Sequence, residues 1–169
     1  MDCYLQLKSQ KLGYYKFNDP EVFKYLKWYY RMPTVPFETV YYPILYWPVG
    51  RILIRLTQFL LKKKYVPFKS KIGNCDAWKG VDLNTDNWHN DFIEGSNTAF
   101  LLYLSDTNES TGGGIQFRRE GVDDVSTVYP KKYDIIVIDQ SMQFQHRVIP
   151  LKKPINRYIA NIEFNILED

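Results

Sequence analysis

Short apolar segments separated by polar or glycine-rich turns dominate the chain from residue 98 onward. The segments with the length and the β-branched or aromatic content of strands are 98–105, 133–139 and 157–161. Three consecutive glycines, Gly112-Gly113-Gly114, provide a tight connection that glycine makes easily, and they open a further strand that reaches Phe117. Strands such as 135–138 would supply the core between two sheets. The pattern therefore predicts a mainly β sandwich in this part of the chain.

The N-terminal part has a different pattern, with two segments that carry helical signals. Residues 20–31 begin with Pro20 and are followed by Pro33, which is typical of a short helix bounded at both ends. Residues 50–64 have a mostly apolar face and a mostly basic or amide face. The first face holds Ile52, Leu53, Leu56, Phe59, Leu60 and Lys63, and the second holds Arg51, Arg55, Gln58 and Lys62. The sequence predicts two amphipathic helices, and the apolar residues are too interrupted by arginine for a membrane span.

Three further segments are predicted to be irregular. The stretch 35–47 is aromatic and broken by prolines, and it is predicted to be a packed loop between the two helices. The polar segments 71–88 and 119–126 are predicted to be surface loops.

Composition and length favour one globular domain with a sizeable core, since the chain has 169 residues, of which 45% are hydrophobic and 17% aromatic. Charge divides it unevenly. Residues 1–71 carry thirteen Lys or Arg against four Asp or Glu, a net of +9, and residues 72–169 carry nine against fifteen, a net of −6. We favour helices that pack on the outer face of a sheet with their basic side chains in water. The alternative is a nucleic-acid surface, in which cations pair with phosphates and aromatic rings stack on bases.

The two cysteines, Cys3 and Cys75, provide no disulfide framework and suit a reducing compartment. The first residues lack a charged segment followed by an apolar run, so no secretory signal is predicted. We therefore expect a cytoplasmic protein.

Candidate chemistry centres on the two histidines of the chain. His89 and Asp91 are two positions apart, so on an extended segment their side chains project to the same face and can bind one cation. His146 lies far enough along the chain for several strands to leave and return. Two neutral imidazoles and one carboxylate on one face of an octahedron leave open positions on non-haem Fe(II). The competing interpretation is that each histidine is an ordinary hydrogen-bonded core or surface residue.

The order of these elements resembles the Fe(II)/2-oxoglutarate-dependent dioxygenases, in particular their prolyl-hydroxylase-like branch. The resemblance covers roughly residues 70–166: His-x-Asp, an apolar strand ending near a tyrosine, a Gly-Gly turn, a distal His followed by Val and Pro, and a basic residue on the next strand. It implies that His89, Asp91 and His146 are iron ligands. It also implies that Arg157 pairs with the distal carboxylate of 2-oxoglutarate and that Tyr103 hydrogen-bonds the same carboxylate. Asn161 shares the face of Arg157 on a strand, so it is a further candidate contact for cosubstrate or substrate.

The resemblance further implies the architecture: a double-stranded β-helix, or jelly roll, of the cupin-like kind. We expect one dioxygenase domain over 1–169, with a helical basic support in 1–70 and the catalytic β-helix in 71–169. The predicted loops 71–88 and 119–126 would flank the metal mouth and shape substrate entry.

The implied activity is hydroxylation of a substrate C–H bond with Fe(II), 2-oxoglutarate and O2, in which decarboxylation of 2-oxoglutarate to succinate accompanies the oxidation. The presence of Asp91 favours hydroxylation, because related carbon halogenases have a small residue in its place. A prolyl or other side chain of a protein or peptide is the expected substrate. The alternatives are a nucleic-acid hydroxylase or demethylase that binds through residues 1–71, and a metal-binding cupin-like barrel without enzymatic activity.

Overall fold

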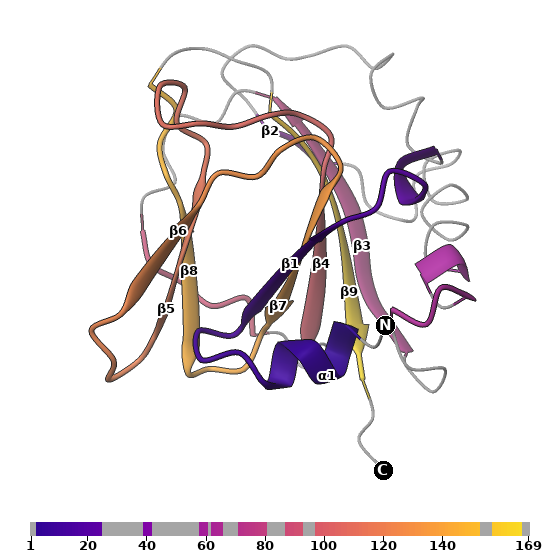
Figure 1. Cartoon of the computed structure of the whole chain (residues 1–169), viewed down its shortest axis with the longest axis horizontal. Helices are drawn as coiled ribbons and strands as arrows, with labels where there is room; N and C mark the ends of the chain where they lie inside the picture. Colours follow the sequence, from indigo (N-terminus) through magenta and orange to yellow (C-terminus); the bar gives the residue numbers. More distant parts are fainter. Residues whose placement is uncertain are drawn as a thin grey trace.

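The computed structural model describes residues 3–24, 39–41, 58–60, 62–65, 71–80, 87–92, 97–152 and 157–166. In these ranges, nine strands form two antiparallel sheets, and a short helix precedes them (Figure 1). The elements are α1 (Cys3–Lys8), β1 (Tyr14–Asn18), β2 (Thr39–Tyr41), β3 (Lys71–Gly80), β4 (Thr98–Tyr103), β5 (Ile115–Arg119), β6 (Val125–Val128), β7 (Asp134–Asp139), β8 (Phe144–Val148) and β9 (Arg157–Asn165). The predicted mainly β class is confirmed.

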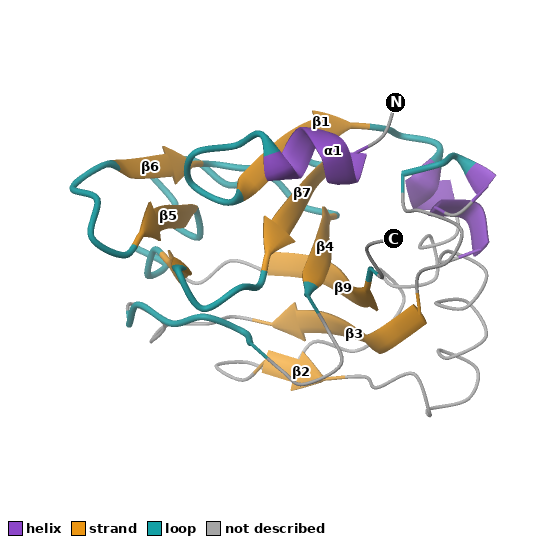
Figure 2. Cartoon of the chain, turned by 90° about the horizontal axis from the view of Figure 1, so that it is seen from below, coloured by secondary structure: helices purple, strands orange, loops and turns teal. Residues whose placement is uncertain are grey.

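The larger sheet has the order β1-β7-β4-β9-β3-β2, and the smaller has the order β6-β5-β8. Figure 2 shows the smaller sheet to one side of the larger, with α1 beside β1 and β7. Strands that are adjacent in the sheets are distant in sequence, as in the pairing of Tyr14 with Ile138 and of Ile115 with Val148. The sheets are therefore held together by long-range antiparallel pairing, which brings the two ends of the chain into one core.

The larger sheet is buried on both faces because successive strand residues alternate between two hydrophobic clusters. One cluster lies between the sheets and includes Tyr103, Phe117 and Ile159. The other lies on the outer face, where Phe100 and other strand residues pack with residues of the N-terminal segments. All six residues of β7 are buried, which explains why its four central residues are all apolar.

Apolar side chains from described residues of the N-terminal part pack on this outer face, as the sequence analysis expected of its helical segments. Leu7 of α1 and Leu60 are buried in the outer cluster, and Phe59 packs against it. Gln58 and Lys62 are exposed, as the amphipathic pattern predicts. No helix in the described ranges is both long and apolar enough to span a membrane.

Several predicted boundaries were wrong. The segment 71–88 is not a loop throughout, because 71–80 is β3, and in 119–126 only 120–124 connect β5 to β6. The predicted loop 35–47 contains β2. The predictions used local polarity or, for 35–47, prolines and aromatic residues, whereas a strand is set by pairing with distant residues, as in the register of β3 with β9.

The N-terminal support is only partly helical. It contains the helix α1, and it also contributes the strands β1 and β2 to the larger sheet. None of these three elements was predicted from the sequence. Of the predicted helix 20–31, residues 22–24 form one 3₁₀ turn, and 25–31 lie outside the described residues. Of the predicted helix 50–64, residues 58–60 and 62 are helical and 63–64 form a turn, and 50–57 lie outside the described residues.

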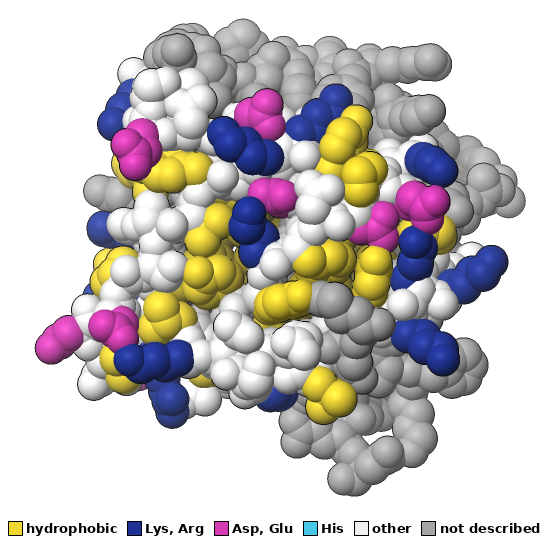
Figure 3. All heavy atoms as spheres, in the orientation of Figure 1, with side chains coloured by type: hydrophobic (Ala, Val, Ile, Leu, Met, Phe, Trp, Pro, Cys, Tyr) yellow, Lys and Arg dark blue, Asp and Glu magenta, His cyan; other side chains and the backbone are white. Residues whose placement is uncertain are grey.

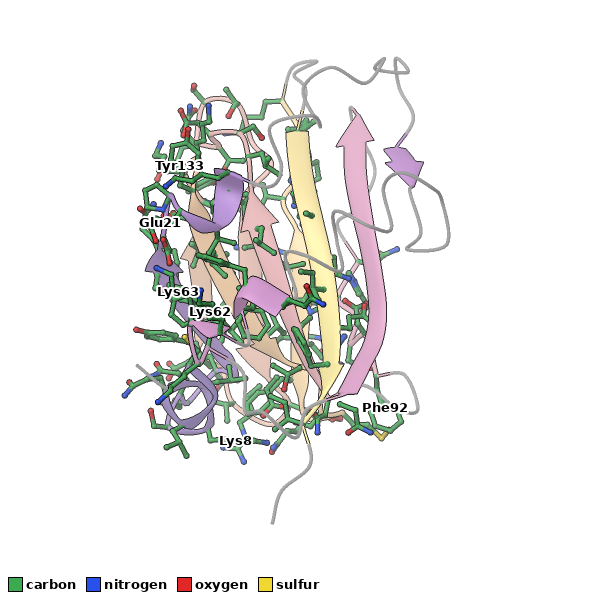
Figure 4. The ribbon with its side chains drawn as sticks, turned by 90° about the vertical axis from the view of Figure 1, so that its right-hand side faces the viewer. Lys8, Glu21, Lys62, Lys63, Phe92 and Tyr133 are labelled. Carbon is green, nitrogen blue, oxygen red and sulfur yellow. The ribbon has the colours of Figure 1, made fainter. Side chains whose placement is uncertain are left out.

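The lysines of the N-terminal segments pair with acidic residues. Lys8 lies 3.4 Å from Asp139, Lys16 lies 3.1 Å from Asp134, and Lys63 lies 2.7 Å from Glu21. Figure 4 shows Lys63 and Glu21 side by side, and Figure 3 shows basic side chains interspersed with acidic ones on one face of the molecule. Because Asp139 and Asp134 lie outside this part, the pairs of Lys8 and Lys16 offset some of its excess positive charge, which favours the packing interpretation over a nucleic-acid surface.

The glycine turn before β5 gives a first testable prediction. Gly112 has φ +74°, and a Cβ there would lie 2.1 Å from the carbonyl oxygen of Pro150. Gly121 has the same φ but nothing within 4 Å of its Cβ position, so it is a matched control. We expect Gly121→Ala to lower the free energy of unfolding by about 1–2 kcal/mol through backbone strain. Gly112→Ala should cost roughly 1–3 kcal/mol more because of the steric overlap.

Urea denaturation of the two variants and the parent measures both effects. Equal losses in the two variants would show that the carbonyl of Pro150 moves aside freely, contrary to the prediction.

Candidate metal centre

The two histidines lie opposite each other on adjacent extended segments. His146 is on β8, and His89 forms an isolated antiparallel bridge with it. The His89 amide donates to the carbonyl of His146 at 3.0 Å, and the His146 amide donates to the carbonyl of His89 at 2.8 Å. This backbone pairing adds the His89 segment to the edge of the smaller sheet and brings the two rings to a centroid separation of 4.5 Å.

Asp91 completes the cluster. Its carboxylate oxygens lie 3.2 Å from Nε2 of His146 and 3.7 Å from Nε2 of His89. One ligand atom from each of the three residues lies within 4.8 Å of the other two. Two imidazole nitrogens and one carboxylate oxygen at these separations can hold a single metal ion, and the donor set suits non-haem iron.

The hydrogen bond at the other nitrogen of His89 fixes its tautomer. Nδ1 of His89 lies 2.9 Å from the carbonyl oxygen of Asn87. A carbonyl can only accept, so Nδ1 carries the proton and Nε2 keeps its lone pair. This is the usual way in which a protein orients a metal-binding imidazole.

Two opposing effects act on the pKa of the Asp91 carboxyl group. Burial raises the pKa, but the hydrogen bond from His146, together with the positive charge of the two histidines when they are protonated, outweighs it and holds the pKa below its ordinary value. The group is therefore a carboxylate at neutral pH, which is the form that binds a metal.

A buried arginine lies in the same layer between the sheets. Arg157, at the start of β9, is only 7% exposed, and its Nη2 donates to the hydroxyl of Tyr103 at 3.4 Å. Its Nε–H has no hydrogen-bond partner among the residues that the structure describes. A buried guanidinium with an unused donor is costly unless an anion completes its hydrogen bonds. The planar fork of Arg157 fits a carboxylate, such as the distal one of 2-oxoglutarate.

The hydroxyl group of Tyr103 is a second potential hydrogen-bond donor beside the Arg157 guanidinium. It is fully buried, and burial raises the pKa of its phenol above the ordinary value, although Arg157 acts in the opposite direction. The phenol stays protonated, and because its oxygen accepts from Arg157, its O–H remains available to an anion.

Asn161 and Glu163 continue the row of alternate β9 positions that begins at Arg157. Both are buried, and the Asn161 amide donates to Oε1 of Glu163 at 2.9 Å. Burial raises the pKa of the Glu163 carboxyl group, and the nearby charge of Asp91 raises it further, against the effect of the Asn161 hydrogen bond. The sequence analysis missed Glu163, although period-two spacing from Arg157 and Asn161 was a signal for it.

The raised pKa of Glu163 predicts a pH-dependent effect on stability. Its folded-state pKa lies above the unfolded value, so the group costs no stability below the ordinary Glu pKa. The cost appears as the pH rises through the unfolded pKa and is complete above the folded one. We expect Glu163→Gln to raise the melting temperature of the metal-free protein at neutral pH, with no difference from the parent at acidic pH. Thermal unfolding across this pH range measures it. A variant less stable than the parent at neutral pH would show that the carboxylate is favourably paired.

Residues 82–165 match the family model of the 2OG-Fe(II) oxygenase superfamily, and this range contains the His-Asp-His cluster, Tyr103 and Arg157. The chain belongs to the 2OG-Fe(II) oxygenase superfamily. It is therefore an oxidoreductase that depends on Fe(II) and 2-oxoglutarate, as the sequence resemblance implied. No curated protein matches the sequence.

Solved structures of oxygenases share the fold at low sequence identity. An oxidoreductase of the 2OG-Fe(II) oxygenase family from Burkholderia pseudomallei has a TM-score of 0.72 at 14% identity, over 96% of this chain and 88% of that one. A prolyl hydroxylase from Trichoplax adhaerens, in complex with a peptide fragment of the hypoxia inducible factor oxygen degradation domain, has a TM-score of 0.67 at 14% identity, over 95% and 86%.

A third structure of this kind is the viral collagen prolyl hydroxylase of Paramecium Bursaria Chlorella virus-1 in its 2OG complex. Its TM-score is 0.60 at 15% identity, over 95% of this chain and 99% of that one. These likenesses bear on the fold, and they confirm the double-stranded β-helix that the sequence analysis expected.

Proposed function

We propose that this oxygenase hydroxylates a C–H bond in a protein or peptide, with a prolyl side chain as the first candidate. His89, Asp91 and His146 would hold Fe(II), and Arg157 with Tyr103 would hold the distal carboxylate of 2-oxoglutarate. The main support for the proposal is the His-Asp-His cluster together with a buried arginine, Arg157, whose Nε–H has no hydrogen-bond partner among the described residues. When bound, iron and 2-oxoglutarate would supply the redox chemistry by which O2 oxidises the substrate C–H bond.

The residues of the chain position the reactants and exclude water. The lowered pKa of the Asp91 carboxyl group and the contact of His89 Nδ1 with the carbonyl oxygen of Asn87 both support the role of Asp91 and His89 as metal ligands. Arg157 and Tyr103 lie in a buried layer, where charge-assisted hydrogen bonds to an anion are stronger than in water. Within the same proposal, Asn161 contacts the cosubstrate or substrate from the neighbouring position on β9.

A peptide substrate is favoured over nucleic acid by two observations. The fold is similar to that of a prolyl hydroxylase in complex with a peptide fragment and to that of a viral collagen prolyl hydroxylase. Lys8 and Lys16 of the N-terminal part pair with acidic residues of the barrel, which reduces the charge that a polyanion would meet. A reducing, cytoplasmic setting would keep Fe(II) and the buried free thiol of Cys3 reduced.

Product analysis with a peptide library tests this proposal. Iron-loaded protein is incubated with 2-oxoglutarate, O2 and matched peptides that contain proline or alanine at one position, and mass spectrometry detects the gain of an oxygen atom. We expect oxygen incorporation in proline peptides, little salt dependence, and no product with His146→Ala. Product from oligonucleotides alone, with turnover that falls steeply as salt rises, would overturn the peptide assignment in favour of a nucleic-acid substrate.

A further inference from the structure

We propose that Trp88 is a positioning residue that two arginines of the smaller sheet hold in place, so that the neighbouring His89 stays in register with His146 for metal binding. The inference rests on the proposed role of the two histidines as iron ligands. It concerns how the chain keeps that site in shape.

The first observation is a pair of cation–π contacts to one indole. The guanidinium carbon of Arg118 lies 4.4 Å from the centroid of the Trp88 ring, and that of Arg147 lies 4.7 Å from it. Trp88 is half-buried, and tryptophan is the best aromatic partner for such contacts. The segment before the metal-binding histidine is thus attached to two different strands, β5 and β8.

The arginines are themselves fixed by hydrogen bonds across the sheet. Nε of Arg118 donates to Oε1 of Gln145, and Nε of Arg147 donates to Oε1 of Gln116, both at 2.7 Å. Each is a directly opposed pair in the register of β5 with β8. Because these bonds restrict both guanidinium groups before Trp88 packs on them, little further side-chain entropy is lost in forming the stack.

Strand alternation connects this stack to the metal cluster. Successive residues of an extended segment point to opposite faces, so each residue of the stack is the chain neighbour of a residue on the inner face. The neighbouring pairs are Trp88 with His89, Arg147 with His146, and Arg118 with Phe117. On the inner side, the ring centroid of His146 lies 4.5 Å from that of His89 and 6.3 Å from that of Phe117. The His89 segment, β5 and β8 therefore form both the arginine–Trp88 stack on one face and the row of His89, His146 and Phe117 on the other.

The His89 segment needs such an attachment because its backbone pairing is short. Its described connection to β8 is the single bridge with His146, outside the named strands. A slip of one residue in an extended segment moves every side chain to the other face, which would turn both His89 and Asp91 away from His146. Trp88 in contact with Arg118 and Arg147 opposes that slip.

Metal affinity of the metal-free protein tests the inference, with Co(II) as the probe. We expect Trp88→Ala to weaken Co(II) binding about 10- to 100-fold, the range for partners that orient metal ligands, and to change the ligand-field absorption of the bound Co(II). Trp88→Phe keeps an aromatic face, so it should recover part of the affinity.

Two adjacent arginines of β5 give a matched pair of variants. Arg118 contacts Trp88, whereas Arg119 lies over the Phe144 ring at 5.7 Å and donates to Gln143 at 2.9 Å. Arg118→Met should weaken Co(II) binding roughly two- to fivefold, as expected for one partly exposed cation–π contact. Arg119→Met removes the same charge from the same strand and should leave the affinity and the Co(II) spectrum unchanged.

The outcomes separate this inference from the proposed metal site. If His146→Ala binds Co(II) as tightly as the parent, the metal site itself is wrong. If His146→Ala loses the metal while Trp88→Ala and Arg118→Met bind it with parental affinity and spectrum, the positioning role is overturned. Should Trp88→Ala fail to fold by circular dichroism, the Arg118→Met and Arg119→Met pair decides, and equal affinities in these two would overturn the inference.

Discussion

Replacing His146 by alanine is expected to abolish iron binding and, with it, the turnover of 2-oxoglutarate. The substitution removes one of three ligands in a cluster whose donor atoms lie within 4.8 Å of one another. Changes to residues that only orient a ligand cost about 10- to 100-fold in metal affinity, so loss of the ligand itself should cost more than about 100-fold. Anaerobic titration of the metal-free protein with Fe(II) measures the effect.

His89→Ala provides the control for folding. The His146 side chain is 8% exposed and that of His89 is 43% exposed, so the two alanine variants should differ in how much they destabilise the fold. If both bind iron equally poorly while only His146→Ala lowers the melting temperature appreciably, the loss reflects ligation. An affinity that follows the melting temperature would contradict the assignment.

Replacing Arg157 is expected to have the second large effect, on 2-oxoglutarate affinity. Removing one partner of a buried, hydrogen-bonded charge pair costs about 2–5 kcal/mol, which is roughly 30-fold to several thousand-fold in a dissociation constant. Arg157→Met should lie in this range. Arg157→Lys keeps the charge but loses the planar fork, so it should recover only part of the affinity.

The carboxylate specificity of Arg157 can be isolated with a matched ligand. 2-Oxopentanoate has a methyl group in place of the distal carboxylate of 2-oxoglutarate. The parent should bind 2-oxoglutarate far more tightly than 2-oxopentanoate, whereas Arg157→Met should hardly distinguish them. Tyr103→Phe removes one neutral donor and should cost only about 0.5–1.5 kcal/mol. Isothermal titration with metal present measures all three, and equal discrimination by parent and Arg157→Met would place the distal carboxylate elsewhere.

The residues of the candidate site could be predicted because their types, spacing and order along the chain match a known family pattern. The spacing of His89 and Asp91 and their order relative to His146 and Arg157 can be read along the chain without knowledge of the strand pairing. The structure then brings the first three together and places Arg157 against Tyr103. It also places Asn161 on the same strand, where its described hydrogen bond is to Glu163.

The features that were missed depend on contacts between distant parts of the sequence. β3 carries polar residues such as Asn74 and Asp76 and is a strand because it pairs with β9. β1 lies in the basic N-terminal part and is a strand because it pairs with β7. Such pairing cannot be read from local hydrophobicity, because β propensity depends strongly on the neighbouring strands.

The arginine contacts of Trp88 were missed for the same reason. Arg118, Arg147 and Trp88 come from three separate segments, and each is unremarkable alone, since single basic or aromatic residues on a strand are common. Only the register of β5 with β8, together with the bridge between His89 and His146, places them on one face. The apolar strands β4 and β7, by contrast, were found from sequence because both of their faces are buried.

Formation of succinate is the most direct test that the chain is an oxygenase in which His146 binds iron and Arg157 binds 2-oxoglutarate. Protein loaded anaerobically with Fe(II) is mixed with 2-oxoglutarate and then exposed to O2, and succinate is measured together with iron-dependent binding of 2-oxoglutarate before oxygen is admitted. We expect the parent protein to bind 2-oxoglutarate in an iron-dependent way and to form succinate. Both should be strongly reduced in His146→Ala and Arg157→Ala. A parent protein that neither binds 2-oxoglutarate in an iron-dependent way nor forms succinate would contradict it.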